Sequence, residues 1–293
     1  MMNLSKVTDK LADIFIYTII TLASLACLIP FLHVAVLSVS SNQAVISRKV
    51  FLWPVGFNLD AYITVFKDPS MIRSLFLTVV ITILFTALGM FLTICSAYPL
   101  TRKRLKGRHA LTVIFLLTMY FSAGIIPDYL LVYNLKLINT IWSLIFPLAF
   151  SAYNMIILKS YIENTIPDSL EESAFLDGCS DIGILIKIIL PLCKPVLATL
   201  CLFYAVGRWN AFQDALYYIT KQNLYPLQLK LNMLVNAAQD TQSISQEINI
   251  TTMLAPEVIK AACIMFATLP IVIVYPFLQK YFVKGIMIGA VKG

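Results

Sequence analysis

The chain has 293 residues, of which 59% are hydrophobic and 13% are charged, and its formal net charge is +7. Soluble globular domains are about 45–50% apolar and about 25% charged, so this composition excludes an ordinary water-soluble protein. The apolar residues are spread along the whole chain, as lipid-embedded segments require. We therefore predict an all-α integral membrane protein with one transmembrane domain over residues 1–293, because backbone groups in lipid must be satisfied within helices.

Six stretches with few or no charged residues predict six transmembrane helices. A helix needs about 20 mostly apolar residues to cross the hydrocarbon core. The predicted spans lie near residues 14–38, 75–100, 110–133, 141–162, 196–218 and 259–278. The first is predicted to stay uncleaved, because its apolar stretch exceeds the about 7–15 residues of a signal peptide.

The short connections set the predicted orientation. Five cations lie in the connection 101–109, whereas the connection 134–140 has only Lys136. The positive-inside rule therefore places 101–109 in the cytoplasm, and the net charge of +7 is interpreted as this bias, without nucleic acid. Alternation makes both termini and the 163–195 loop cytoplasmic. The predicted outside segments are 39–74, 134–140 and 219–258.

The sequence contains no residue pattern typical of an enzyme active site or of a metal site. The six cysteines form no Cys-x-x-Cys pair, and the two histidines, His33 and His109, are far apart in sequence. No phosphate-binding loop ending in Lys-Ser/Thr is present, so the chain is not expected to bind ATP by that route. We predict no catalytic residues, no metal site and no cofactor on this chain.

The 163–195 connection is predicted to form a helix–turn–helix. Pro167 and Asp168 open it, and Ser169 with Glu172 matches a capping box. Gly178 suits the left-handed residue that ends a first short helix. Such an element either docks a partner or lies on the headgroups, and these two interpretations stay open on physical grounds.

A second short helix is predicted to follow the turn. Ser180 or Asp181 can cap it, and its apolar residues recur at i, i+3, i+4 and i+7, which predicts one apolar face. The residues of this face are Ile182, Leu185, Ile186 and Ile189.

These residues resemble a known signature. Glu172-Ser173-Ala174, then Asp177-Gly178, then Ile189-Leu190-Pro191 is similar to the EAA motif of ABC importer permeases, with Ser173 in place of the first alanine. Further resemblance comes from Trp209-Asn210, Tyr225-Pro226-Leu227-Gln228 and the closing segment 281–293. The chain resembles the carbohydrate-uptake type, close to the maltose-transporter G subunit and its complex-polysaccharide branch.

The resemblance implies a fold and an assembly. The fold would be that of ABC importer permeases (MetI-like), with a cytoplasmic coupling helix between spans four and five. The partners would be a homologous second permease, two ATPase subunits that bind ATP and Mg, and an extracellular sugar-binding lipoprotein. The residues implied in coupling to the ATPase are Glu171, Glu172, Ser173, Ala174, Asp177, Gly178, Leu190 and Pro191.

A substrate pathway is predicted from polar and aromatic residues within the spans, which are costly in lipid and often mark a cavity. The candidates are Tyr153, Asn154, Arg208, Trp209, Asn210 and Gln213. Alternatively, Arg208 and Asp214 each pair with the partner subunit or reach water. The polar stretch 239–247 is either a surface for the binding protein or a mobile loop.

The sequence thus predicts a permease subunit of a binding-protein-dependent ABC importer in a bacterial plasma membrane. Its solute would be a sugar, most simply an oligosaccharide, moved by alternating access. Two alternatives stay open: an ABC permease for amino acids, phosphate or metal ions, and a self-sufficient secondary transporter. The second fits poorly, because such transporters typically have about ten or more spans built from repeats, whereas six spans without buried acidic relays are predicted here.

Overall fold

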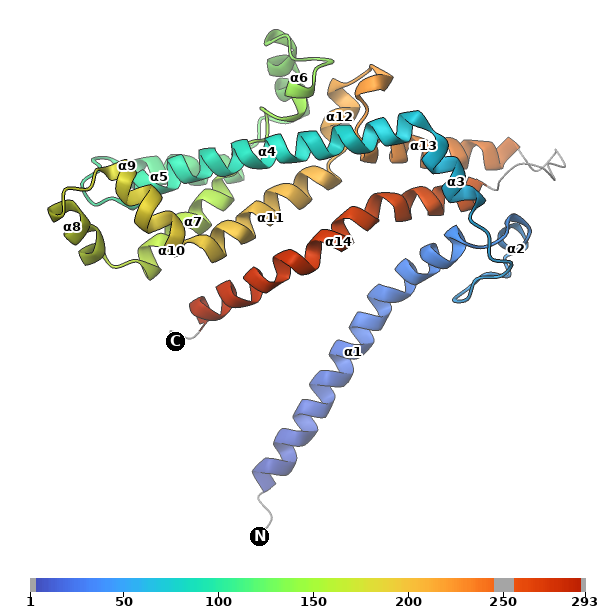
Figure 1. Cartoon of the computed structure of the whole chain (residues 1–293), viewed down its shortest axis with the longest axis horizontal. Helices are drawn as coiled ribbons and strands as arrows, with labels where there is room; N and C mark the ends of the chain where they lie inside the picture. Colours follow the sequence, from blue (N-terminus) through green and yellow to red (C-terminus); the bar gives the residue numbers. More distant parts are fainter. Residues whose placement is uncertain (1–3, 245–255, 291–293) are drawn as a thin grey trace. The chain divides into compact units, whose positions relative to one another are not determined.

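The computed structural model describes residues 4–244 and 256–290, and within these ranges every regular element is a helix (Figure 1). The longest are α1 (Leu4–Ser38), α4 (Pro69–Thr101) and α14 (Pro256–Ala290). Other α-helices are α2 (Asn42–Ile46), α3 (Asp60–Lys67), α5 (Arg108–Tyr120), α6 (Ile125–Asn134), α7 (Ala152–Thr165), α8 (Asp168–Leu176), α9 (Asp181–Ile184), α10 (Leu190–Leu192), α11 (Lys194–Asn210), α12 (Gln213–Tyr218) and α13 (Leu227–Ile244). Three further turns of helix are η1 (Ile141–Leu144), the π-helix η2 (Leu185–Ile189) and η3 (Gln222–Leu224).

Within the described residues, three helices are long and apolar enough to cross a membrane, and up to five spans result if each of two bent helix pairs counts as one. The three are residues 12–38 of α1, the whole of α4 and residues 256–274 of α14. The all-helical, membrane-spanning prediction is therefore supported at this coarser level. The count of six spans stays a prediction.

The range 110–133, predicted as one helix, contains two. Helices α5 and α6 are bent by 111° at a break between Tyr120 and Ile125. Gly124 ends the break with φ +91°, a backbone conformation that a continuing helix does not contain. Apolar composition alone did not reveal this break.

The predicted helices 141–162 and 196–218 are also interrupted. In the first range, η1 is followed by an irregular segment with Pro147, and α7 begins only after Ser151. In the second range, α11 ends at Asn210 and α12 begins at Gln213. Continuity was therefore predicted wrongly here, because local turns and caps end helices that hydropathy treats as continuous.

The chain divides into two compact units, of which the first comprises residues 1–69 and 231–269. Within it, α1 ends where the Ser38 hydroxyl lies 2.8 Å from the hydroxyl of Tyr62 on α3. Helices α3 and α14 are in contact through an edge-to-face pair of rings, Phe66 and Phe266, with centroids 5.2 Å apart. The apolar side chains of α1, such as Phe15 and Leu22, are exposed, as expected for a helix facing lipid.

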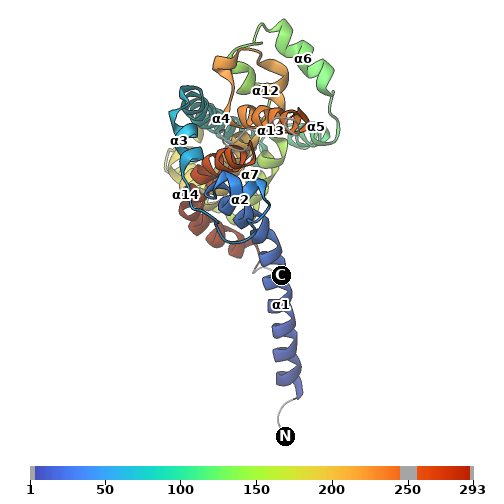
Figure 2. The ribbon, with the colours of Figure 1, turned by 90° about the vertical axis from the view of Figure 1, so that its right-hand side faces the viewer.

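The second unit, residues 70–230 and 270–293, is organised along α4. One core cluster contains Ala97 and Leu100 at the end of α4 with residues of α7 to α11. Another contains Ile81 with residues of α6, η1 and α12. Figure 1 shows α8 and α9 at one end of α4, and Figure 2 shows α6 beside α12. The two ends of α4 therefore carry different sets of short helices.

Between these clusters α4 crosses α11 closely. A Cβ atom at Gly89 would lie 2.8 Å from the carbonyl oxygen of Ala149 and 2.8 Å from the ring of Tyr204. The Tyr204 hydroxyl lies 2.8 Å from the Thr93 hydroxyl and accepts a hydrogen bond from Ser151 N–H at 3.1 Å. Gly89, which has no side chain, and the buried Tyr204 therefore determine how closely α4 and α11 approach each other.

Candidate functional site

The helix–turn–helix predicted in the 163–195 loop is present, and we call Asp168–Ile184 the helical hairpin. Its first helix, α8, ends at Leu176 with Asp177 as the C-cap residue, and Gly178 adopts φ +81°, as the sequence predicted. The Ser180 hydroxyl accepts a hydrogen bond from Gly183 N–H at 3.2 Å and caps α9. The prediction of Ser180 as a cap is thus confirmed.

The predicted capping box does not form. Helix α8 starts at Asp168 and its N-cap residue is Pro167, without a side-chain cap. Ser169 therefore lies inside the first turn, where its carbonyl oxygen accepts a hydrogen bond from the Ser173 hydroxyl at 2.8 Å. The motif matched, but the helix begins two residues too early to use it.

The predicted apolar face of the second helix is wrong at two of its four residues, whereas Leu185 and Ile189 do pack into the core. Ile182 and Ile186 are exposed, whereas Ile184 and Ile189 are 1% and 0% exposed. The π-helix at Leu185–Ile189 is the reason. It adds a residue to the turn and places i and i+5, rather than i and i+4, on the buried side.

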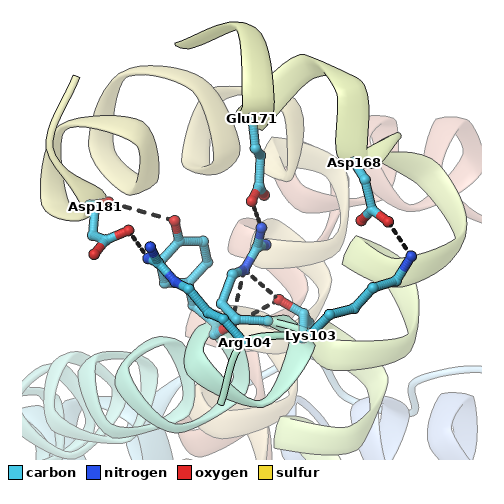
Figure 3. Close-up of polar contacts among 8 residues, drawn as sticks. Lys103, Arg104, Asp168, Glu171 and Asp181 are labelled. Carbon is cyan, nitrogen blue, oxygen red and sulfur yellow. Dashed lines mark hydrogen bonds and ion pairs between the residues drawn. The ribbon is translucent and has the colours of Figure 1, made fainter. Parts of the chain in front are cut away.

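Ion pairs tie the helical hairpin to residues Arg102–Arg104, which follow α4 and are called the basic segment (Figure 3). Arg102 pairs with Glu171, Lys103 with Asp168, and Arg104 with Asp181. The sequence analysis treated these cations only as an orientation signal. Their acidic partners are also clustered in the sequence, 65 or more residues away. The sequence alone does not show which of the three cations pairs with which of these acidic residues.

The three pairs differ in burial. The Arg102 and Glu171 side chains are 13% and 15% exposed, whereas those of Lys103 and Asp168 are 76% and 57% exposed. Burial lowers the pKa of the Arg102 guanidinium, and the hydrogen bond from Lys103 lowers the pKa of the Asp168 carboxyl. Exposed pairs contribute little to stability, so the half-buried pair is the stronger constraint.

The other residues expected in coupling fall into exposed and buried groups. Glu172, Ser173, Asp177, Gly178 and Pro191 are exposed. Ala174 is buried at 6% and belongs to the same core cluster as Ala97 and Leu100, and Leu190 is partly buried. The hairpin therefore has a packed base and an exposed tip.

The six residues predicted for a substrate pathway are divided among three cavities. Tyr153, Asn154 and Arg208 line one of about 830 Å³, which we call the Tyr153 cavity. Asn210 and Gln213 line another of about 520 Å³, which we call the Asp128 cavity. These two cavities share Leu148 and Ala211 as wall residues, so they adjoin each other.

The Trp209 side chain lines a different cavity from that of Asn210. It is 7% exposed and lines a third, apolar cavity of about 320 Å³ with Val79 and Pro270. Neighbouring residues on a helix point about 100° apart, so the two residues of this pair serve different cavities. The structure therefore does not bring Trp209 and Asn210 to a common cavity.

Arg208 forms an ion pair inside the chain. Its two terminal nitrogens donate to both oxygens of Asp214, at 2.5 and 3.0 Å, and one also donates to the Leu144 carbonyl at 3.1 Å. Its guanidinium lies 5.7 Å from the ring centre of Phe85. The alternative that Arg208 and Asp214 each pair with another subunit does not fit this geometry.

The architecture is that of the membrane domain of an ABC importer. It matches a solved structure of a bacterial ABC transporter involved in the import of the acidic polysaccharide alginate, with a TM-score of 0.85 and 31% identity over 94% of this chain and 98% of that one. The model of the family described as binding-protein-dependent transport system inner membrane component matches residues 106–288. The chain belongs to this family.

Two relatives from Bacillus subtilis (strain 168) cover nearly the whole chain. The polygalacturonan/rhamnogalacturonan transport system permease protein YtcP is 42% identical over 97% of this chain and 99% of its own length. Protein LplC is 44% identical over 91% of this chain and 90% of its own length. The chain is thus a permease subunit of a binding-protein-dependent ABC importer, as the EAA resemblance predicted.

Proposed function

We propose that this permease translocates oligosaccharides into the cell by alternating access. The observation that carries the proposal is the 42% identity, over nearly the full length, to a permease named for polygalacturonan and rhamnogalacturonan transport. The structural match to an alginate importer supports the same class of solute. The alternatives of a non-sugar solute and of a self-sufficient transporter are not favoured by these relatives.

The proposed assembly follows from the family. This chain pairs with a homologous second permease, and two ATPase subunits bind ATP and Mg below them. An extracellular lipoprotein delivers the sugar. The complex lies in a bacterial plasma membrane, with six spans in this chain and both termini in the cytoplasm. The stretch 239–247, proposed to contact the lipoprotein, lies partly outside the described residues.

The helical hairpin is the proposed coupling element. Its tip offers a surface of the kind that an ATPase groove would take: Leu176 is 90% exposed, and Glu172 and Phe175 are exposed beside it. The left-handed Gly178 makes the turn that projects this tip. Closure of the ATPases on ATP would shift the permease between two states, since ATP binds those states with different affinity.

The Tyr153 cavity is the proposed part of the substrate pathway. An exposed Tyr153 ring beside the buried Asn154 amide combines an apolar surface with a hydrogen-bonding group, a common composition of small-molecule sites. The Arg208 charge is already neutralised by Asp214, so it offers little net attraction to an acidic sugar. The wall of this cavity therefore suits hydroxyl groups.

Transport by the purified complex tests the function. The permease pair and ATPases are placed in liposomes with the binding protein, and uptake of labelled oligosaccharides is compared with uptake of amino acids and phosphate. ATP-dependent uptake of an oligosaccharide is expected. Uptake of an amino acid or phosphate alone contradicts the proposal.

Coupling is tested by two substitutions at the tip. Gly178→Pro removes the left-handed turn, and Glu172→Lys reverses the charge offered to the ATPase. Both should abolish substrate-stimulated ATP hydrolysis while the protein stays inserted. Asn164→Lys, which adds charge to an exposed position of the same loop, is the control and should have little effect. Normal stimulation in both tip variants would show that the hairpin is not the coupling element.

A reporter that is active only outside the cell tests the orientation. Fusions between residues 222 and 250 should be active, and fusions within 104–108 or 175–180 should be silent. Activity at 175–180 would place the hairpin outside and remove the docking proposal.

A further inference from the structure

The end of α4 holds both arms of the helical hairpin. Glu171 on α8 pairs with Arg102, and Asp181 at the start of α9 pairs with Arg104 (Figure 3). The Tyr98 hydroxyl also donates to the Asp181 carbonyl at 3.4 Å. Both α8 and α9 therefore contact one short stretch, residues 98–104, although a polar turn separates these two helices in the sequence.

The Arg102 side chain is oriented by contacts with the end of α4 in addition to its ion pair with Glu171. Its Nε donates to the Thr101 hydroxyl at 3.0 Å, and its guanidinium lies 4.4 Å from the ring centre of Tyr98. A planar guanidinium fixed on a ring and by a hydrogen bond loses little freedom when it pairs with a carboxylate. The side chain is thus already oriented toward α8.

Apolar packing reinforces the connection beneath the ion pairs. Ala174 of α8 and Ile184 of α9 are buried in one cluster with Ala97 and Leu100 of α4. Packed interfaces of this kind move as units rather than deform continuously. A displacement of the hairpin tip must therefore move the end of α4 or break this contact.

Helix α4 also reaches the proposed pathway. It runs without interruption from Pro69 to Thr101, and it carries Phe85, which lines the Tyr153 cavity and lies against the Tyr204 ring. Phe85 precedes Arg102 by 17 positions, about 26 Å along the helix axis at 1.5 Å per residue. One continuous helix, with Pro99 in its last turn, thus connects the hairpin base with the cavity wall.

We propose that Arg102, through its ion pair with Glu171, is the positioning residue that transmits displacement of the helical hairpin into α4 and so to the cavity wall. This inference rests on the proposed docking of the hairpin to the ATPase. It adds a route from hairpin to cavity that does not follow the chain through α7 or α11.

Charge reversal tests the pair in the complete transporter with its binding protein. Arg102→Glu and Glu171→Arg each place like charges in a half-buried site, so each should lower the sugar transported per ATP hydrolysed by about tenfold or more. In Arg102→Glu, basal ATP hydrolysis and the yield of assembled complex should stay within about twofold of the parent, because this substitution leaves the helical hairpin itself unchanged. The double variant should restore most of the transport per ATP.

Two further variants keep the test decisive. Lys106→Glu reverses an exposed charge in the same connection and should leave transport per ATP unchanged. If the reversals fail to assemble, Glu171→Gln keeps the shape of the side chain while removing its charge, and it should lower transport per ATP by a smaller factor.

The outcomes separate this inference from the docking proposal. Normal transport per ATP in Arg102→Glu, together with loss of stimulation in Glu172→Lys, overturns the role of Arg102 and leaves docking intact. Full stimulation in Glu172→Lys contradicts docking, and the inference fails with it. If the reversals fail to assemble, normal transport per ATP in Glu171→Gln overturns the inference. No recovery of transport per ATP in an assembled double variant makes the pair purely structural and also overturns it.

Discussion

Arg208 and Asp214 neutralise each other at the junction between α11 and α12. Their side chains are 3% and 10% exposed, and two hydrogen bonds join the guanidinium to the carboxylate. A third bond, to the Leu144 carbonyl, ties the same guanidinium to the end of η1. The pair therefore links three elements where the helix predicted at 196–218 is interrupted.

Removal of one partner should destabilise the fold strongly. Arg208→Ala or Asp214→Asn leaves the other group buried without its partner, a loss of about 3–5 kcal/mol for a typical buried pair. Thermal unfolding of the purified permease in lipid nanodiscs measures the effect. The double variant Arg208→Leu with Asp214→Leu should recover part of the loss, because no charge is then left unpaired. Unchanged unfolding of Arg208→Ala, with only subunit assembly reduced, would instead point to a partner in the other permease.

A methyl group at Gly89 should disturb the crossing of α4 and α11. Gly89→Ala brings Cβ to 2.8 Å from the Ala149 carbonyl and the Tyr204 ring, and overpacking of this kind costs about 1–3 kcal/mol. Gly207→Ala is the matched control, because Gly207 lies in helix α11 and a Cβ atom there would meet no heavy atom within 4 Å beyond its own helix backbone. It should be neutral or slightly stabilising, since alanine favours helix more than glycine. Equal unfolding temperatures for the two variants would contradict the close contact.

The Tyr204 hydroxyl should contribute to the start of α7. Tyr204→Phe removes the acceptor for Ser151 N–H and the contact with Thr93, and an unsatisfied buried donor costs about 1–3 kcal/mol. Thr93→Val removes only one of the two contacts and should cost less. Tyr225→Phe removes an exposed hydrogen bond and serves as control. A loss in Tyr225→Phe as large as that in Tyr204→Phe would show that the buried network has no special weight.

Acid titration should detect the Lys103–Asp168 contact. The pKa of Asp168 is lowered in the folded protein, so the contribution of this pair to stability is present above the unfolded value of about 3.9 and disappears as the pH falls through the lower folded value. Lys103→Ala should raise the pKa of Asp168 toward the unfolded value, measured by the carboxyl ¹³C shift. Lys106→Ala should leave the pKa of Asp168 lowered. No change in Lys103→Ala would show that the contact does not persist in solution.

Much of the hairpin was predictable because it depends on local chemistry. Gly178 and Ser180 adopt their expected roles, since a left-handed turn and an N-cap are decided by one or two residues. The buried face was mispredicted because the π-helix at Leu185–Ile189 depends on packing against α4 and α7, which periodicity does not contain. The capping box failed for a local reason, since Pro167 is the N-cap residue and α8 begins directly after it.

Composition and local motifs were enough to predict the lipid environment and the class of this protein. An apolar excess forces helices in lipid, and the EAA residues with their turn are read from consecutive positions. Which distant charges meet depends instead on the packing of the folded chain: Arg102 pairs with Glu171, and Arg208 pairs with Asp214 rather than with another subunit. Trp209 and Asn210 were likewise divided between cavities by the rotation of α11. Such pairings depend on where helices are interrupted and how they pack. Both features are determined by contacts between segments far apart in the chain.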